Sequence, residues 1–286
     1  MSGTVGSLEG ISDNGKFAVF AIDHRDSLRA FLDPSDPDAI PAETLTALKI
    51  ELVTAGAAEA TGVMLESEYS IPQVIDAGAL PPGVGFVAAL EAQGYLGELG
   101  SAPTEMLQGW SPSAARDAGA SACKLLLPFH PDRPLAELQE KVALETVARC
   151  HDAGMPLVLE PLFYGLDDPA DRPRVVIETA NRFAAAGADL LKLPFPIDTS
   201  VDEDRDHWHA TCATVSSLVR SPWVLLSGGG SFDAFAAQVE VARSAGAAGF
   251  MVGRALWGEA VLAPVSERAA RLEVVRRRLA HLRGLL

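Results

Sequence analysis

Two lysines stand inside apolar runs that otherwise look like buried strands. Lys124 lies in ACKLLLPF (122–129) and Lys192 in ADLLKLPFP (188–196), in a chain that has only five lysines. Burial disfavours the charged form of an amine, and a nearby second cation does the same, so such a lysine can be neutral near pH 7. A neutral amine can attack a ketone and form a Schiff base, an electron sink for cleaving carbon–carbon bonds. Lys192 is therefore a candidate nucleophile; pairing with a core carboxylate or snorkelling to the rim is the alternative.

Carboxylates occur in similar positions at or after apolar runs. Glu160, in VLEPL, is a candidate general acid or base, because burial raises the pKa of a carboxyl group while nearby lysines lower it. The alternative for Glu160 is a structural ion pair with Lys124. Asp23 follows the first apolar run and either caps the next helix or binds a substrate hydroxyl or a lysine. Further candidate substrate-binding residues after the first two runs are His24, Arg25 and Glu66.

Two glycine-containing turns in the C-terminal part could bind an anion. One turn contains Ser227, Gly228 and Gly229, and the other contains Gly253 and Arg254. Glycine lets the backbone approach a ligand, and the N–H groups at the start of a helix bind anions. The arginine adds a planar set of donors that suits phosphate. A turn with no ligand is the alternative.

Eight short apolar runs recur along the chain and would position these residues. Each is continuously apolar rather than alternating, as in strands that are buried on both faces of a parallel sheet. The runs are 17–23, 62–66, 83–90, 122–129, 156–162, 188–196, 223–230 and 247–256. The segments between them include 134–153, 174–187 and 231–246, which have the spacing of amphipathic helices.

Eight strands that alternate with helices predict an α/β fold, a single (β/α)8 TIM barrel domain that spans residues 1–286. In such barrels the active site lies at the C-terminal ends of the strands, and the loops after strands 7 and 8 commonly bind phosphate. An open doubly wound sheet is the main alternative. Its glycine-rich fingerprint would follow the first strand, where this chain has DHRDSL.

Composition limits the partners of the chain. The formal net charge of −15 argues against nucleic acid and anionic membrane surfaces, which both need a basic footprint. Three scattered cysteines indicate free thiols in a reducing compartment, and no apolar run has the length of a membrane span. We therefore expect a cytoplasmic protein. HWH (207–209) lacks a third ligand, so we expect no metal site. The arginine-rich segment 268–284 has an apolar stripe, which predicts the last barrel helix and a candidate homo-oligomer contact.

The motifs together resemble class I aldolases of the tagatose-1,6-bisphosphate aldolase and sulfofructose-phosphate aldolase type. The similarity covers FAIDHRDSL, ACKLLLPF, LEPL, GADLLKLP, PWVLLSGGG and AGAAGFMVGRALW, and so spans most of the chain. It implies a (β/α)8 barrel that works without a metal or another cofactor. It also assigns the Schiff base to Lys192, and the companion catalytic roles to Lys124, Glu160 and Asp23. Phosphate binding falls on Ser227, Gly228, Gly253 and Arg254.

The chain departs from this family pattern at three positions. Several relatives have Gln in place of His24, some have Glu in place of Pro194, and many have Asp in place of Glu66. All three positions are near strand ends that could meet the far end of a sugar. The departures therefore bear on the substrate more than on the reaction type.

These observations predict an aldolase that reversibly cleaves a phosphorylated ketose through a Schiff base on Lys192, to give dihydroxyacetone phosphate and an aldehyde. A metal-independent sugar-phosphate isomerase or epimerase that uses Glu160 and Asp23 is one alternative. A barrel that binds sugar phosphates without catalysis is the other. The aldehyde half of the substrate is left open.

Overall fold

Eight parallel strands close into a barrel in the order in which they occur in the sequence. The computed structural model describes residues 6–92 and 99–286. Each strand pairs with the next, and the last pairs with the first, so the predicted (β/α)8 fold is confirmed. The strands are β1 (Phe17–Ala21), β2 (Gly62–Leu65), β3 (Gly85–Ala89), β4 (Ala122–Pro128), β5 (Leu157–Leu162), β6 (Leu190–Leu193), β7 (Trp223–Leu226) and β8 (Gly249–Val252).

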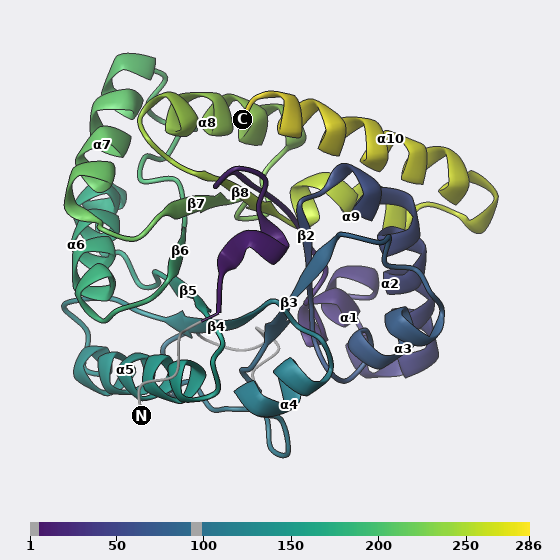
Figure 1. Ribbon diagram of the computed structural model, residues 1–286. Coiled ribbons are helices and arrows are strands. Elements are labelled where there is room, and N and C mark those ends of the chain that lie inside the picture. The colour runs from purple at the N-terminus through teal and green to yellow at the C-terminus, as the bar shows by residue number, and fades with distance from the viewer. Residues whose placement is uncertain (1–5, 93–98) are drawn as a thin grey trace.

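Helices surround the ring of strands (Figure 1). The α-helices are α1 (Asp26–Leu32), α2 (Ala42–Gly56), α3 (Ile71–Asp76), α4 (Pro112–Asp117), α5 (Ala136–Asp152), α6 (Arg172–Ala185), α7 (Arg205–Leu218), α8 (Phe232–Ser244), α9 (Arg254–Leu262) and α10 (Val265–Gly284). Short 3-10 helices are η1 (Leu8–Ile11), η2 (Pro37–Ala39), η3 (Ala57–Glu59) and η4 (Pro169–Asp171).

The C-terminal segment differs in one respect from its prediction. The helix that directly follows β8 is α9, and α10 is a further helix that packs against α9 and α2. Figure 1 shows α10 in yellow along the outside of α8 and α9. The predicted apolar stripe is confirmed, because Val275, Leu279 and Leu282 are buried.

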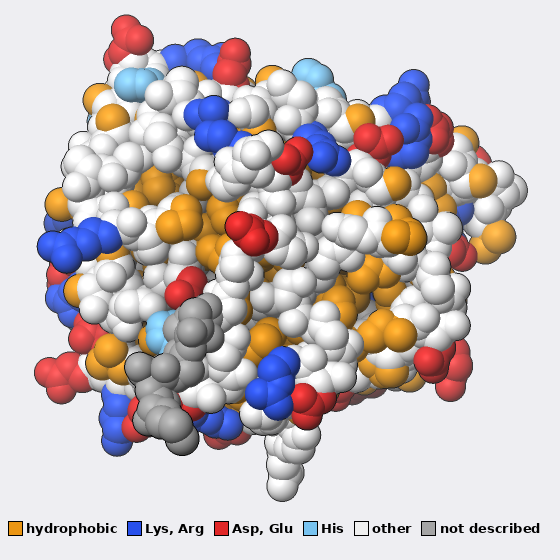
Figure 2. All heavy atoms as spheres, viewed as in Figure 1, with side chains coloured by type: hydrophobic (Ala, Val, Ile, Leu, Met, Phe, Trp, Pro, Cys, Tyr) orange, Lys and Arg blue, Asp and Glu red, His pale blue; other side chains and the backbone are white. Residues whose placement is uncertain are grey.

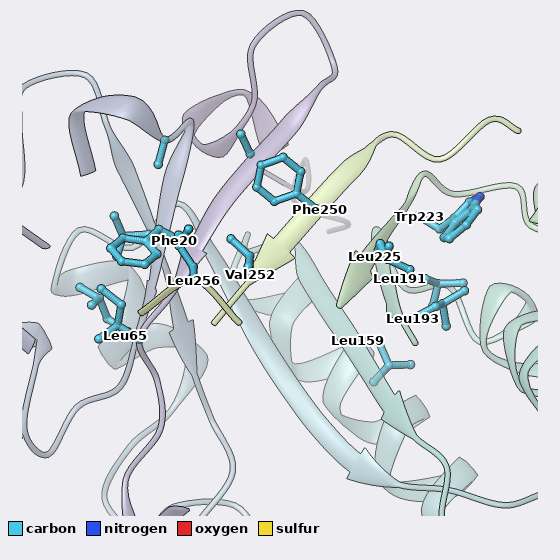
Figure 3. Packing of buried hydrophobic residues seen from close by; sticks show 14 of the residues in the cluster. Phe20, Leu65, Leu159, Leu191, Leu193, Trp223, Leu225, Phe250, Val252 and Leu256 are labelled. Carbon is cyan, nitrogen blue, oxygen red and sulfur yellow. The ribbon is translucent and has the colours of Figure 1, made fainter. Parts of the chain in front are cut away.

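Strand side chains alternate between the barrel interior and the layer of helices. Figure 3 shows outward-pointing side chains such as Leu191, Leu193 and Leu225, which belong to the large cluster between the strands and the helices. Leu190 and Val224 belong instead to the separate cluster inside the barrel. Both faces of each strand are therefore apolar in their first half, which explains why the strands read as continuous apolar runs.

The N-terminal segment closes the end of the barrel at which the strands begin. In Figure 1 the purple segment that contains η1 lies across the ring of strands. Ile11 is fully buried in the inner cluster and packs on Gly62, at the start of β2. A Cβ atom at Gly85, the first residue of β3, would lie 2.1 Å from the carbonyl oxygen of Gly10. Glycine at this position therefore allows the backbone of η1 to touch the barrel.

Charged side chains of both signs lie on the outer surface of the protein (Figure 2). Figure 2 shows acidic and basic side chains interspersed around the edge of the viewed face. No helix within residues 6–92 and 99–286 is long and apolar enough to cross a membrane. The three cysteines are buried and have free thiols.

The packing of η1 predicts a stability effect. Replacement of Ile11 by Ala leaves a cavity in the inner cluster, and we expect it to lower the free energy of unfolding by about 2–5 kcal/mol. Equilibrium urea unfolding measures this change. Ile75 is 45 % exposed on α3, so Ile75→Ala is the matched control and should cost less than about 1 kcal/mol. Equal losses of unfolding free energy in the two variants would contradict the role of Ile11 in closing this end of the barrel.

Candidate active site

Strand alternation turns both lysines into the barrel. Lys192 on β6 stands between Leu191 and Leu193, which point outward in Figure 3. On β4, Cys123 and Leu125 pack in the outer cluster and leave Lys124 between them on the inner side. The two lysines that break the apolar pattern of the sequence therefore enter the same interior.

Lys192 and Glu160 form an ion pair at the C-terminal half of the barrel. Lys192 Nζ lies 2.8 Å from Glu160 Oε1, and the two side chains are 7 % and 8 % exposed. Lys192 Nζ also lies 3.9 Å from the sulfur of Met64, an apolar neighbour on β2. An amine in this position is almost enclosed by protein but still reachable from the pocket described below. A carboxylate within hydrogen-bond distance can take up or return a proton beside it.

Lys124 is the centre of a buried ion cluster. Its Nζ lies 2.8 Å from Asp23 Oδ2, 2.5 Å from Glu91 Oε1 and 3.2 Å from Glu160 Oε2. The lysine side chain is fully buried. Glu91 Oε2 also accepts a hydrogen bond from the backbone N–H of Leu126. Sequence reasoning missed Glu91, although a carboxylate directly after the run 83–90 was the available signal.

The charges of this cluster fix the protonation of Asp23 and His24. Burial alone would raise the pKa of Asp23, but Lys124, Lys192 and His24 outweigh it and hold that pKa well below its usual range. Burial is the largest influence on His24 and lowers its pKa to about 3, with Arg254 and Lys192 acting in the same direction and Asp23 opposing them. At neutral pH, Asp23 is thus a carboxylate and His24 a neutral imidazole.

The turns after β7 and β8 lie side by side. The N–H of Gly253 points toward Ser227 Oγ at 3.4 Å, and Gly253 precedes the first turn of α9 without a side-chain cap. Gly228 and Gly229 have φ angles of 54° and 82°, in the left-handed region that favours glycine. A Cβ atom at Gly229 would lie 3.4 Å from the guanidinium of Arg254. The two turns therefore combine two exposed glycines, a hydroxyl and an arginine, which is a donor set for phosphate.

A pocket of ≈ 220 Å³ connects the ion pair with these turns. It is lined by Ala21, Asp23, His24, Ser27, Leu99, Leu126, Glu160, Leu162, Lys192, Leu226, Ser227, Gly228, Gly229, Met251, Gly253 and Arg254. Nine of the twelve residues that the sequence suggested for catalysis or binding are in this set. Lys124 is a tenth that acts from behind the wall, through Glu160 and Asp23.

Arg25 and Glu66 lie outside the pocket wall. Arg25 donates to Glu68 Oε2 at 2.7 Å and to the backbone carbonyl of Glu91 at 2.5 Å. Glu66 is buried and accepts hydrogen bonds from Lys49 on α2 and from the N–H groups of Glu68 and Tyr69. These contacts hold the segments after β2 and β3, and a role for either residue in contact with substrate stays a prediction.

The Lys49–Glu66 pair was not predicted, since nothing in the sequence of α2 marks Lys49 as buried. Burial lowers the pKa of Lys49, while Glu66 opposes that shift.

Within the described ranges, no group of three or more His, Cys, Asp or Glu side chains is arranged to hold a metal ion. His207 of the HWH segment pairs instead with Asp202 at 2.6 Å on the surface.

Comparisons with protein families, with curated proteins and with solved structures all identify aldolases as similar to this chain. A family model described as DeoC/LacD family aldolase matches residues 17–259. Tagatose 1,6-diphosphate aldolase 1 of Enterococcus faecalis is 26 % identical over 281 residues, which cover 91 % of this chain and 85 % of that protein. Tagatose 1,6-diphosphate aldolase of Streptococcus agalactiae is 27 % identical, with 89 % and 85 % covered. An archaeal fructose 1,6-bisphosphate aldolase superposes with a TM-score of 0.67 at 19 % identity and 97 % coverage of both chains, a likeness of fold.

The neutral state of His24 can be measured. We expect the imidazole of His24 to stay neutral down to about pH 4 in the folded protein, because its pKa is lowered to about 3, whereas histidine in the unfolded chain titrates near pH ~6.5. Between these two values the unfolded chain binds a proton that the folded chain does not. This group therefore lowers the stability of the fold progressively as the pH falls below about 6.5.

NMR titration of the histidine ring signals tests this, with His24→Gln to assign the resonance. The same signal in urea serves as the control. Titration of the folded signal near pH ~6.5 would show that His24 is not held neutral by its surroundings.

Proposed function

Given that the chain belongs to the DeoC/LacD family of aldolases, we propose that Lys192 forms a Schiff base with a phosphorylated ketose and that the enzyme cleaves this ketose reversibly between C3 and C4. The chain is thus a carbon–carbon lyase. The observation that carries the assignment of roles is the pair of Lys192 Nζ and Glu160 Oε1, 2.8 Å apart on the pocket wall beside the turns after β7 and β8.

The first step joins the substrate to the enzyme. The lone pair of Lys192 Nζ attacks the C2 carbonyl, and the resulting carbinolamine loses water to give an iminium ion. Glu160 is within hydrogen-bond distance of this nitrogen and can transfer the protons that the loss of water requires. Met64 lies 3.9 Å from Lys192 Nζ, and Glu160 Oε1, at 2.8 Å, can take up the proton of the amine before the attack.

The second step breaks the bond. Glu160, alone or through a water molecule, accepts the proton of the C4 hydroxyl, the C3–C4 electron pair moves into the iminium, and an aldehyde leaves. The enamine that remains is protonated at C3, and water hydrolyses the new iminium to release dihydroxyacetone phosphate. Lys124 holds Glu160 in place through the 3.2 Å contact with Oε2. Because Lys124 also contacts Asp23 and Glu91, it orients the acid–base group relative to the nucleophile.

The remaining wall positions the substrate. Ser227, the glycines of both turns and Arg254 would hold the C1 phosphate through backbone N–H groups and the guanidinium. Asp23, a carboxylate at neutral pH, would accept a hydrogen bond from a substrate hydroxyl. A phosphate held by these turns would place C2 of the substrate beside the amine of Lys192. This positioning lowers the entropic cost of bringing the two reacting groups together.

The role of Lys192 predicts a trapped adduct. Borohydride with dihydroxyacetone phosphate should add a stable mass to one peptide, the one that contains Lys192, because reduction converts the iminium to a secondary amine. Lys192→Met should lose the adduct and at least about 10⁴-fold in kcat, as removal of a covalent nucleophile does in other enzymes. Peptide mass spectrometry and a coupled cleavage assay measure the two effects.

Lys141, whose side chain is 69 % exposed on α5, provides the matched control. Lys141→Met should keep both the adduct and the activity. A folded Lys192→Met variant that retains turnover would favour proton-transfer chemistry by Glu160 and Asp23, an isomerase or epimerase, over the aldolase.

The role of Glu160 predicts a separation of the two steps. Glu160→Gln keeps the shape of the side chain but cannot accept the C4 hydroxyl proton, so kcat should fall by about 10²–10⁴-fold. The adduct with dihydroxyacetone phosphate should still be trapped, more slowly. Glu145→Gln, at a position that is 62 % exposed, is the control. A Glu160→Gln enzyme with normal kcat would exclude this residue as the base.

A further inference from the structure

We propose that the aldehyde half of the substrate carries no charge, so that the enzyme acts on ketoses with a single phosphate, the one at C1. This inference rests on the proposed function and specifies its substrate class. It separates the chain from relatives whose names specify a diphosphate substrate. The observations that carry it are the apolar wall of the pocket opposite the phosphate turns and the engagement of the nearby cations elsewhere.

The wall opposite the phosphate turns is made of leucines. In the closed ring, β4 lies four strands away from β8 and three from β7. Leu126 on β4, Leu162 at the end of β5 and Leu99, which follows β3, all line the pocket. A substrate held by its C1 phosphate at β7 and β8, with C2 at Lys192 on β6, extends its C4–C6 end toward this side. Apolar side chains there favour an uncharged aldehyde half.

Basic side chains near this side of the barrel opening are already engaged. Arg25 is buried between Glu68 and the backbone carbonyl of Glu91. Arg133, after β4, donates to the carbonyl of Gly165 and to Asp167. Burial and the neighbouring Arg133 lower the pKa of His130, with Asp132 opposing them, which disfavours a charged imidazole. None of these three groups lines the pocket as described.

The basic groups that line the pocket either act on the C1–C3 half of the substrate or are uncharged. Among the described lining residues they are Lys192, Arg254 and His24. Lys192 becomes the imine nitrogen, Arg254 belongs to the phosphate turns, and His24 has a pKa of about 3 and is neutral. Residues 1–5 and 93–98, which are outside the described ranges, contain no Lys, Arg or His in their sequence.

Charged groups that remain on the wall are carboxylates. Asp23 and Glu160 line the pocket. A second phosphate near them would lose water and meet like charge without gaining a partner. The pocket therefore has no cationic partner for a second anion, and its carboxylates repel one.

Arg172 is a further basic residue near β5 and β6 to be considered as a partner for a second anion. It begins α6, its Nε donates to the carbonyl oxygen of Phe195 at 3.0 Å, and its guanidinium stacks on the ring of Phe163 at 5.2 Å. Burial lowers its pKa, and the charge of Asp198 opposes that shift. The stacked guanidinium lies outside the pocket wall, so we assign it a structural role and test it directly.

The test runs the reaction in the direction of synthesis. Dihydroxyacetone phosphate is combined with glyceraldehyde, lactaldehyde or glycolaldehyde, or with glyceraldehyde 3-phosphate, and the ketose phosphate formed is measured by mass spectrometry. The new bond joins C3 of the enamine to the aldehyde carbon, and the aldehyde oxygen takes the proton that Glu160 returns. We expect kcat/KM for the best uncharged aldehyde to exceed that for glyceraldehyde 3-phosphate by about tenfold or more, the scale on which a site discriminates a group that it cannot pair.

Two variants at one position sharpen the result. Leu162→Arg adds a cation to the leucine wall and should shift the ratio toward glyceraldehyde 3-phosphate by about tenfold, as a new charge-assisted contact would. Leu162→Met changes the shape of the wall without the charge and should leave the preference for uncharged aldehydes. Borohydride trapping of dihydroxyacetone phosphate shows that each variant is folded and binds the ketone.

Three outcomes would overturn the inference. The first is a preference of the wild-type enzyme for glyceraldehyde 3-phosphate; if Arg172→Gln abolishes that preference, Arg172 holds the second anion. The second is condensation with none of the uncharged aldehydes although the adduct at Lys192 is trapped. The third is absence of the adduct itself, which refutes the proposed function and the inference with it, and so is distinguishable from the first two.

Discussion

The burial of Lys124 is the constraint on which the arrangement of the site depends. An unpaired ammonium inside the barrel would cost several kcal/mol of stability, so its partners must be supplied from neighbouring elements. Asp23 after β1, Glu91 after β3 and Glu160 on β5 supply them, all within 3.2 Å. The cluster therefore ties four parts of the ring to one point at the C-terminal half of the barrel, and through Glu160 it reaches Lys192 on β6.

The same cluster decides which groups remain available to a substrate. Asp23 and Glu160 each turn one side toward Lys124 and the other toward the pocket, and Glu160 reaches Lys192 with its second oxygen. Lys124 itself is sealed off. Arg25 extends the network outward, because it binds the backbone carbonyl of Glu91 and the side chain of Glu68. Among the residues that the sequence suggested for the site, Asp23 and Glu160 thus line the pocket, whereas Lys124 and Arg25 lie behind it and hold the lining residues in place.

The sequence predicted the parts of this arrangement that follow from strand periodicity. Continuous apolar runs predict strands that are covered on both faces, and a lysine within such a run must point inward when its neighbours point outward, as Lys192 does. The family resemblance, drawn from short motifs in order, is confirmed. A contact between Lys124 and Glu160 was among the alternatives drawn from the sequence and is present, but pairings that depend on how a helix packs could not be predicted. Lys49 and Glu66 meet only because α2 packs beside β2, and no local pattern in the sequence marks such a contact.

Reaction type and substrate choice therefore depend on different side chains of the same barrel, even where these share a strand, as Glu160 and Leu162 do on β5. The nucleophile, the acid–base group and the phosphate turns come from β5 to β8, and the ion cluster holds Glu160 beside Lys192. The leucines that would face the aldehyde half take part in no ion pair, so their replacement by other uncharged side chains leaves the pair of Lys192 and Glu160 in place. Substitutions at Leu126 or Leu162 can thus change which aldehyde is accepted without disturbing the step that breaks the bond. A shared chemistry with different substrates is the expected result of this separation within one fold.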